Sequence, residues 1–264
     1  MSARTEHCLA LGYIAAAGTR DHDGFADAVL RLFDAAGLVP RKLSYLLGKA
    51  VTRAFKESSM RSLIADSALR RLTIWSDMSV NAPEVVMYLR DDPKSPDTDH
   101  RHGGAVVDAG VSPEALVEFA RALVACTPLV SAGIAGFRNH GAAQAEGWNG
   151  APAGLLDAAT DARLYWDAMH DRRTRDKLRR LYPITIIGPA IWAQLPPMPA
   201  FDPMPTVEEL GDCKIVTAWP ELCDPRDPAF LRGTRALREW LWPYTIQNPA
   251  DHVDNDPPCA DVAT

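Results

Sequence analysis

The order of elements that the apolar pattern predicts over residues 7–137 constrains this fold more than any other feature of the sequence. An apolar strand at 7–16 is followed by a helix that ends at Gly37, and its buried stripe repeats at helical spacing. A second helix begins at Ser112-Pro113-Glu114, which supplies a capping side chain, a proline at the first helical position and an acid in the first turn. Three further strands are predicted at Val85–Leu89, Ala105–Val107 and Val130–Phe137. The order strand, helix, strand, strand, helix, strand is typical of a ferredoxin-like unit, an α+β fold with an antiparallel sheet.

The remaining segments are less regular in pattern. Residues 41–56 and 60–72 carry apolar residues broken by many basic ones, which favours helix or loop. The second half predicts a helix over 154–181, an interrupted strand over 184–192, a proline-rich loop over 195–205, a strand over 214–219 and a closing helix over 230–241. This second α+β half would extend the ferredoxin-like N-terminal half.

The length of 264 residues is large for one domain and small for two. We expect a single α+β domain over 1–264 with two packed halves, 1–139 and 153–250, joined by a Gly- and Ala-rich bridge. Residues 251–264 contain four Asp and no Lys or Arg, so they are predicted to form a flexible acidic tail.

Charge and cysteine usage narrow the class of protein. The 28 Lys and Arg residues against 34 Asp and Glu residues give a net charge of −6, which argues against nucleic acid as a general partner because phosphate binding needs a basic face. No stretch approaches the roughly 18–20 apolar residues that span a bilayer. The five cysteines are odd in number and lack CxxC spacing, which favours free thiols in a reducing cytoplasm. We therefore expect a cytoplasmic protein without a membrane segment.

Standard catalytic motifs are absent, since the chain has no GxSxG, HExxH, GxxxxGK[ST] or GxGxxG. We therefore expect a protein that is not an enzyme and that uses no cofactor or metal. Asp97, Asp99, His100 and His102 are the best metal candidate, because carboxylate and imidazole together suit divalent ions. All four fall in one polar turn, whereas metal ligands are usually held by rigid elements, so a solvated loop is favoured. A metal-dependent hydrolase that uses them, or another enzyme, is the alternative function.

Two cysteines are candidates for a nucleophile, paired with a distant histidine such as His140 or His170. Cys126 lies near the C-terminal end of a predicted helix, where the helix dipole disfavours a thiolate. Cys223 precedes Asp224, which also disfavours negative charge on sulfur. Inert thiols are therefore the favoured interpretation.

Residues 201–227 are the strongest candidate for a binding surface, with seven acidic and two basic residues and a net charge of −5. Proline-fixed loops lose little entropy on binding, and a negative patch steers a basic partner into contact. The predicted partner-binding residues are Asp202, Glu208, Glu209, Asp212, Trp219, Glu221, Asp224 and Asp227. An ordinary acidic surface beside core tryptophans is the alternative interpretation.

Three segments carry a family resemblance: RRLYPITIIGPAIWAQLPP, KIVTAWPELCDPRDPAFL and LREWLWPYTIQNP. Over residues 160–250 the chain resembles bacterial toxin-immunity proteins, particularly those of type VI secretion effectors. The matching features are a strand with Ile187, Gly188 and Trp192, a proline-rich loop, and an Asp-Pro-x-Asp-Pro turn that begins at Asp224 and precedes a closing helix.

The resemblance implies a cytoplasmic protein that binds one cognate toxin and blocks its active site. Some relatives pair with nuclease toxins, and an acidic inhibitor could occupy a basic nuclease cleft. The other candidate is a homo-oligomeric interaction protein whose 41–72 region pairs between subunits. The oligomeric state stays open.

Overall fold

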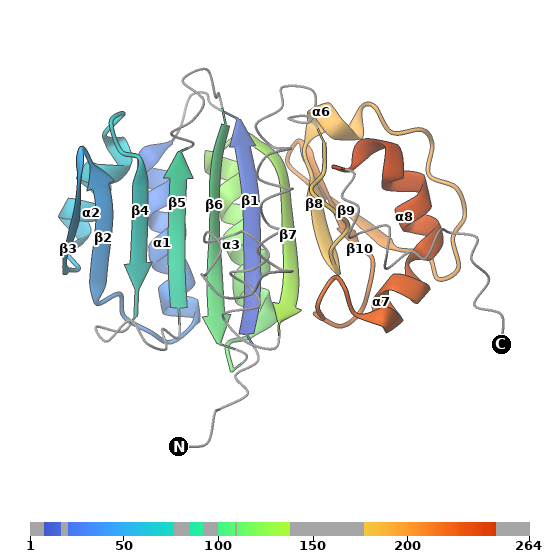
Figure 1. Cartoon of the computed structure of the whole chain (residues 1–264), viewed down its shortest axis with the longest axis horizontal. Coiled ribbons are helices and arrows are strands. Elements are labelled where there is room, and N and C mark those ends of the chain that lie inside the picture. Colours follow the sequence, from blue (N-terminus) through green and yellow to red (C-terminus); the bar gives the residue numbers. More distant parts are fainter. Residues whose placement is uncertain are drawn as a thin grey trace.

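The structure is a computed structural model, and its dominant feature is one open antiparallel sheet with helices alongside (Figure 1). It describes residues 8–16, 21–76, 85–91, 100–108, 110–137 and 177–246, with the backbone alone at 85–91 and 100–102. The ten strands among these residues have the order β3-β2-β4-β5-β6-β1-β7-β8-β10-β9. The α+β class predicted from the sequence is confirmed.

The strands and helices have the following bounds. The strands are β1 (Cys8–Ala16), β2 (Lys42–Leu47), β3 (Lys49–Ala54), β4 (Arg71–Trp75), β5 (Val85–Asp91), β6 (His100–Asp108), β7 (Leu129–Phe137), β8 (Ile184–Ile187), β9 (Thr206–Leu210) and β10 (Cys213–Thr217). The helices are α1 (His22–Ala35), α2 (Glu57–Ala65), α3 (Pro113–Cys126), α6 (Pro189–Trp192), α7 (Pro228–Gly233) and α8 (Arg235–Leu241), followed by the 3₁₀ turn η3 (Trp242–Tyr244).

The predicted ferredoxin-like order is present as β1, α1, β5, β6, α3 and β7. In the sheet, β6 lies between β1 and β5, so β1-α1-β5 forms the split crossover of such a unit. The helix start predicted at Ser112 and the start of α1 are both capped by side chains. Asp21 Oδ1 accepts from the Gly24 N–H at 2.8 Å, and Ser112 Oγ accepts from the Glu114 N–H at 3.3 Å.

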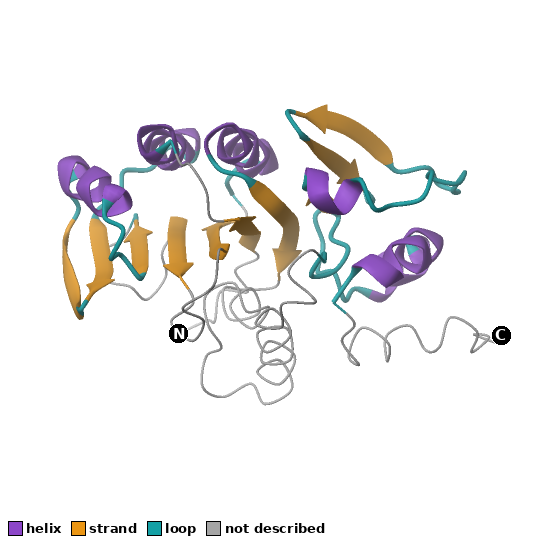
Figure 2. Cartoon of the chain, turned by 90° about the horizontal axis from the view of Figure 1, so that it is seen from above, coloured by secondary structure: helices purple, strands orange, loops and turns teal. Residues whose placement is uncertain are grey.

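Helices α1, α2 and α3 cover one face of the sheet (Figure 2). Beneath them lies the largest core, to which β1 contributes Leu9, Leu11 and Tyr13 from alternate positions. The opposite side of β8 and β10 packs against α7 and α8, where Phe230 and Leu241 are fully buried. Strands β7, β8 and β10 are therefore buried on both faces, which explains their nearly continuous apolar runs.

The prediction of helix or loop was wrong for most of residues 41–56, which form β2 and β3, but residues 60–70 do lie in helix α2 and the loop after it. Elements β2, β3, α2 and β4 lie between α1 and β5 in the chain and extend the sheet beyond β5. Of the basic residues that obscure the pattern, Lys49 and Arg53 lie on edge strand β3, which is exposed along most of its length, and the others lie on or beside β2, α2 and β4. An edge strand buries so little surface that its sequence carries no clear alternation.

The second half also differs from its prediction in places. Residues 177–183 are irregular, with Leu178 in a bridge to Thr245, so the helix predicted over 154–181 does not include its last residues. Residues 138–176, and with them the bridge and the rest of that helix, lie outside the described residues, as does the tail. The strand predicted over 184–192 ends at Ile187, and the predicted closing helix divides into α7 and α8.

The continuity of the sheet joins the halves, because β7 pairs with β8 between Ser131 and Ile187. Among the helices that the structure describes, none combines the length and apolar character needed to cross a membrane.

Candidate functional site

The predicted acidic surface lies at one end of the sheet, around the β9–β10 hairpin. Strand β9 carries Glu208 and Glu209, and Gly211 and Asp212 form the two-residue turn to β10. Gly211 adopts a positive φ of 54°, as such tight hairpin turns require. Asp202 precedes β9, and Glu221, Asp224 and Asp227 follow β10.

Both glutamates of β9 already have cationic partners. Glu208 Oε2 lies 3.2 Å from Nη2 of Arg121 in α3, and Glu209 pairs with Lys214 on the neighbouring strand. The hydrogen bond from Lys214 and its positive charge lower the pKa of the Glu209 carboxyl. These side chains therefore present less free negative charge than the sequence suggested.

Asp224 and Asp227 have structural roles in the turn before α7. Asp224 Oδ1 accepts from the Arg226 N–H at 2.9 Å and lies 3.1 Å from Nε of the same arginine. Asp227 is the N-cap of α7, where its Oδ1 accepts from the Ala229 N–H at 2.7 Å. These carboxylates hold the Asp-Pro-x-Asp-Pro turn in place.

Trp219 is half-buried and belongs to the C-terminal core. Its ring meets Phe230 edge-on at a centroid distance of 6.2 Å, and a Cβ at Gly233 would lie 2.2 Å from it. Of the eight predicted residues, Asp202, Asp212 and Glu221 are left as exposed carboxylates with no ion pair within the described part of the chain.

A second charged surface, at the opposite end of the sheet, was missed by the interface prediction. Residues 41–76 contain eight Lys and Arg residues against two Asp and Glu residues, a net charge of +6. Seven of the cations form what we call the basic edge: Arg41, Lys42, Lys49, Arg53, Lys56, Arg70 and Arg71. A count of charge along the sequence would have found it, but only the sheet order shows that it borders an edge strand.

The basic edge is free of ion pairs among the described residues, in contrast to Arg61, which contacts three carboxylates. Two of its cations lie over aromatic rings instead. Lys42 Nζ is 5.4 Å from the Trp75 ring centroid, and the Arg53 guanidinium is 5.1 Å from that of Tyr45. Such cation–π contacts orient the charges without neutralising them.

The described thiols are poor nucleophiles. Burial, followed by the charge of Asp108, raises the pKa of Cys8 to about 12. Burial also raises the pKa of Cys126, Cys213 and Cys223 to about 11, and neighbouring aspartates act in the same direction. A thiolate is the reactive form, so these groups are unreactive at neutral pH.

The metal candidate of the sequence is only partly described. His100 and His102 lie in β6, and Asp97 and Asp99 lie outside the described residues. Across the described ranges, no group of three or more His, Cys, Asp or Glu side chains is arranged to hold a metal ion.

Comparisons with known proteins give a likeness of fold. No protein-family model matches the chain, and no curated protein sequence matches it. Among solved structures, the chain is similar to the Pseudomonas aeruginosa T6SS protein PA0821, with a TM-score of 0.56 and 11% sequence identity. The match covers 97% of this chain and 86% of that one, so it extends over the whole fold.

Proposed function

We propose that this protein is a cytoplasmic immunity protein, which binds a cognate secreted antibacterial toxin and neutralises it by covering the toxin's active site. Two lines support the proposal. The segments around Ile187 and Asp224 resemble immunity proteins of type VI secretion effectors, and the fold is similar to that of a T6SS protein.

The observation that carries a binding role is the open sheet with two exposed edge strands of opposite character. Strand β3 borders the basic edge, and β9 carries the acidic hairpin. Edge strands expose unpaired backbone groups, so both ends of the sheet can accept a partner. Charge on these edges would steer the encounter and orient the toxin.

Among the described residues the thiols are poor nucleophiles, and no group of three or more His, Cys, Asp or Glu side chains is arranged to hold a metal ion. A binding role needs neither. Inhibition requires only that the toxin's active site be occluded in a stable complex. A stable complex of this kind buries about 1,200–2,000 Å² in total.

Co-expression tests the proposal. A secreted protein encoded beside this gene would be induced in a bacterial host with and without the chain, and the lysate run on a sizing column. Rescue of growth together with co-elution is the expected result. An unrelated α+β protein from the same plasmid is the control. Toxicity that persists although the chain is expressed and folded would contradict the proposal.

A further inference from the structure

We propose that β3 and the basic edge are the docking surface for an acidic, extended segment of the partner, which adds to the sheet as a further strand beside β3. The inference deepens the proposed immunity function and rests on it for the identity of the partner. The preference of this surface for an acidic extended segment can also be tested with peptides, without the toxin.

Strand β3 has the geometry that strand addition requires. It pairs with β2 over Lys49–Ala54, and among the described strands it is the last of the sheet on that side. Five of its six residues are exposed, and Val51 is half-buried. Its outer backbone N–H and C=O groups therefore face solvent, and the strand contains no proline to block pairing.

The charges on β3 select an acidic partner. Lys49, Val51 and Arg53 share one side of the strand because side chains alternate between faces. On the other side, Thr52 donates to Ser44 Oγ at 3.1 Å between two alanines, so that side is small and neutral. A complementary strand would place acidic residues opposite Lys49 and Arg53 and an apolar residue opposite Val51.

The same charges disfavour a second copy of β3. An antiparallel pairing centred on Val51 would set Lys49 of each copy opposite Arg53 of the other, and like charges opposite one another are destabilising. Lysine on an edge strand is a common protection against such self-pairing. A second copy could instead offer its acidic β9, so that outcome belongs in the test.

Preorganised cations strengthen the case for a ligand. The Arg53 guanidinium lies over the Tyr45 ring, on the face of the sheet that also carries Lys49. The Lys42 ammonium lies over the Trp75 ring, on the opposite face, which carries Thr52. Both stay exposed or half-exposed without a carboxylate partner in the described residues. Charges fixed in advance lose less side-chain entropy when an acidic segment binds.

The first experiment measures binding of the toxin from the co-expression test to wild-type protein and to the double variant Lys49→Glu/Arg53→Glu. We expect at least about a tenfold loss of affinity with an unchanged melting temperature. The matched control is Arg31→Glu/Arg232→Glu, which makes the same change in net charge at exposed positions away from the edge. Equal losses of affinity in the two variants would show that only the net charge of the protein matters, which would overturn the inference.

Hydrogen exchange on the complex tests the added strand itself. Outward amides of β3 should be slowed at least about tenfold by the toxin, while those of β9 keep their rates. A reversed pattern, together with loss of binding in Glu208→Lys/Glu209→Lys, would move the docking site to the acidic hairpin. In that case immunity stands and the β3 inference fails.

If the toxin forms no complex, the proposed function fails, and a peptide decides the surface chemistry. The probe is a synthetic peptide of about ten residues with Glu, Val and Glu at alternate positions, compared with the same peptide carrying Lys in place of both Glu. The inference is supported if the wild-type protein binds the acidic peptide but not the lysine peptide, and if Lys49→Glu/Arg53→Glu no longer binds the acidic peptide. No binding of either peptide overturns it.

Two other occupants have distinct signatures. Tighter binding of a single-stranded DNA oligonucleotide than of the acidic peptide would assign the surface to nucleic acid. Self-association on sedimentation, abolished by both Lys49→Glu/Arg53→Glu and Glu208→Lys/Glu209→Lys, would assign it to β9 of a second copy. Either result would overturn an acidic partner strand.

Discussion

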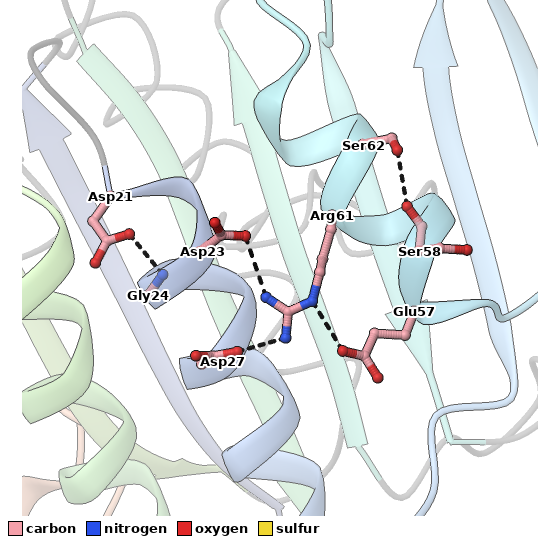
Figure 3. Close-up of polar contacts among 8 residues, drawn as sticks. All are labelled: Asp21, Asp23, Gly24, Asp27, Glu57, Ser58, Arg61 and Ser62. Atoms are coloured by element: carbon pink, nitrogen blue, oxygen red, sulfur yellow. Dashed lines mark hydrogen bonds and ion pairs between the residues drawn. The ribbon is translucent and has the colours of Figure 1, made fainter.

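Nη2 of Arg61 in α2 lies 2.5 Å from Oδ1 of Asp27 in α1 (Figure 3). The same guanidinium reaches Glu57 Oε1 at 2.9 Å and Asp23 Oδ1 at 3.4 Å. Hydrogen bonds to Asp27 and then Glu57 raise the pKa of Arg61 further above its usual value. Since α2 is part of the segment that carries the basic edge, this contact ties that segment to the ferredoxin-like unit.

Replacement of Arg61 tests how much these ion pairs contribute to the stability of the protein. Arg61→Ala should lower the melting temperature by a few degrees at most, because the three carboxylates are more than half exposed and surface ion pairs contribute little. The effect should shrink as NaCl is raised, since salt screens exposed charges. Arg31→Ala, on an exposed face of α1, is the control and should be neutral. An undiminished effect at high salt would mean that packing dominates the contact.

Gly133 in the centre of β7 should not tolerate a side chain. A Cβ there would lie 2.1 Å from the ring of Tyr182, which is buried against the sheet. We expect Gly133→Ala to lower the free energy of unfolding by about 1–3 kcal/mol in urea denaturation. Gly110→Ala, where nothing lies within 4 Å, should be neutral or slightly stabilising. Equal effects of the two substitutions would show that the Tyr182 ring can move aside.

Asp227 should act through its cap and not through its charge. Asp227→Ala removes the acceptor for the Ala229 N–H and should reduce the free energy of unfolding by about 0.5–2 kcal/mol. Asp227→Ser restores a capping oxygen without a charge, so it should recover most of that loss and bind the toxin like wild type. If the serine variant folds normally but binds weakly, the carboxylate is part of the interface after all.

The buried thiols should make the protein less stable as the pH rises above about 8.5, the usual pKa of an unfolded cysteine. The unfolded chain then loses thiol protons that the folded chain keeps, because the folded pKa is about 12 for Cys8 and about 11 for Cys126 and Cys213. Each such thiol adds a decline of up to about 1.4 kcal/mol per pH unit until the pH reaches its folded pKa.

Denaturant titrations at pH 8, 9 and 10 would measure this decline. A Cys8→Ala variant should have a shallower slope than wild type, whatever its stability at pH 7. Identical slopes would indicate that Cys8 ionises as easily in the folded protein as in the unfolded chain.

Local signals in the sequence were enough for part of this structure. The caps at Asp21 and Ser112 and the apolar run of β7 are visible to any pattern search, because they depend on neighbours within one turn or on burial of both strand faces. The acidic residues were also visible, but their partners were not. Arg121 and Lys214 neutralise Glu208 and Glu209 only because the folded chain brings them together.

The sequence by itself determined the α+β class, the order of the ferredoxin-like elements, and the excess of charge in residues 41–76 and 201–227. The tertiary structure decided which strands lie at the ends of the sheet, and therefore that these two charged segments occupy opposite edges. It also decided which of the charged side chains in these two segments form ion pairs and which do not. The physical reason is that strand pairing and ion pairing join residues distant in the chain, whereas hydrophobic period and capping are local.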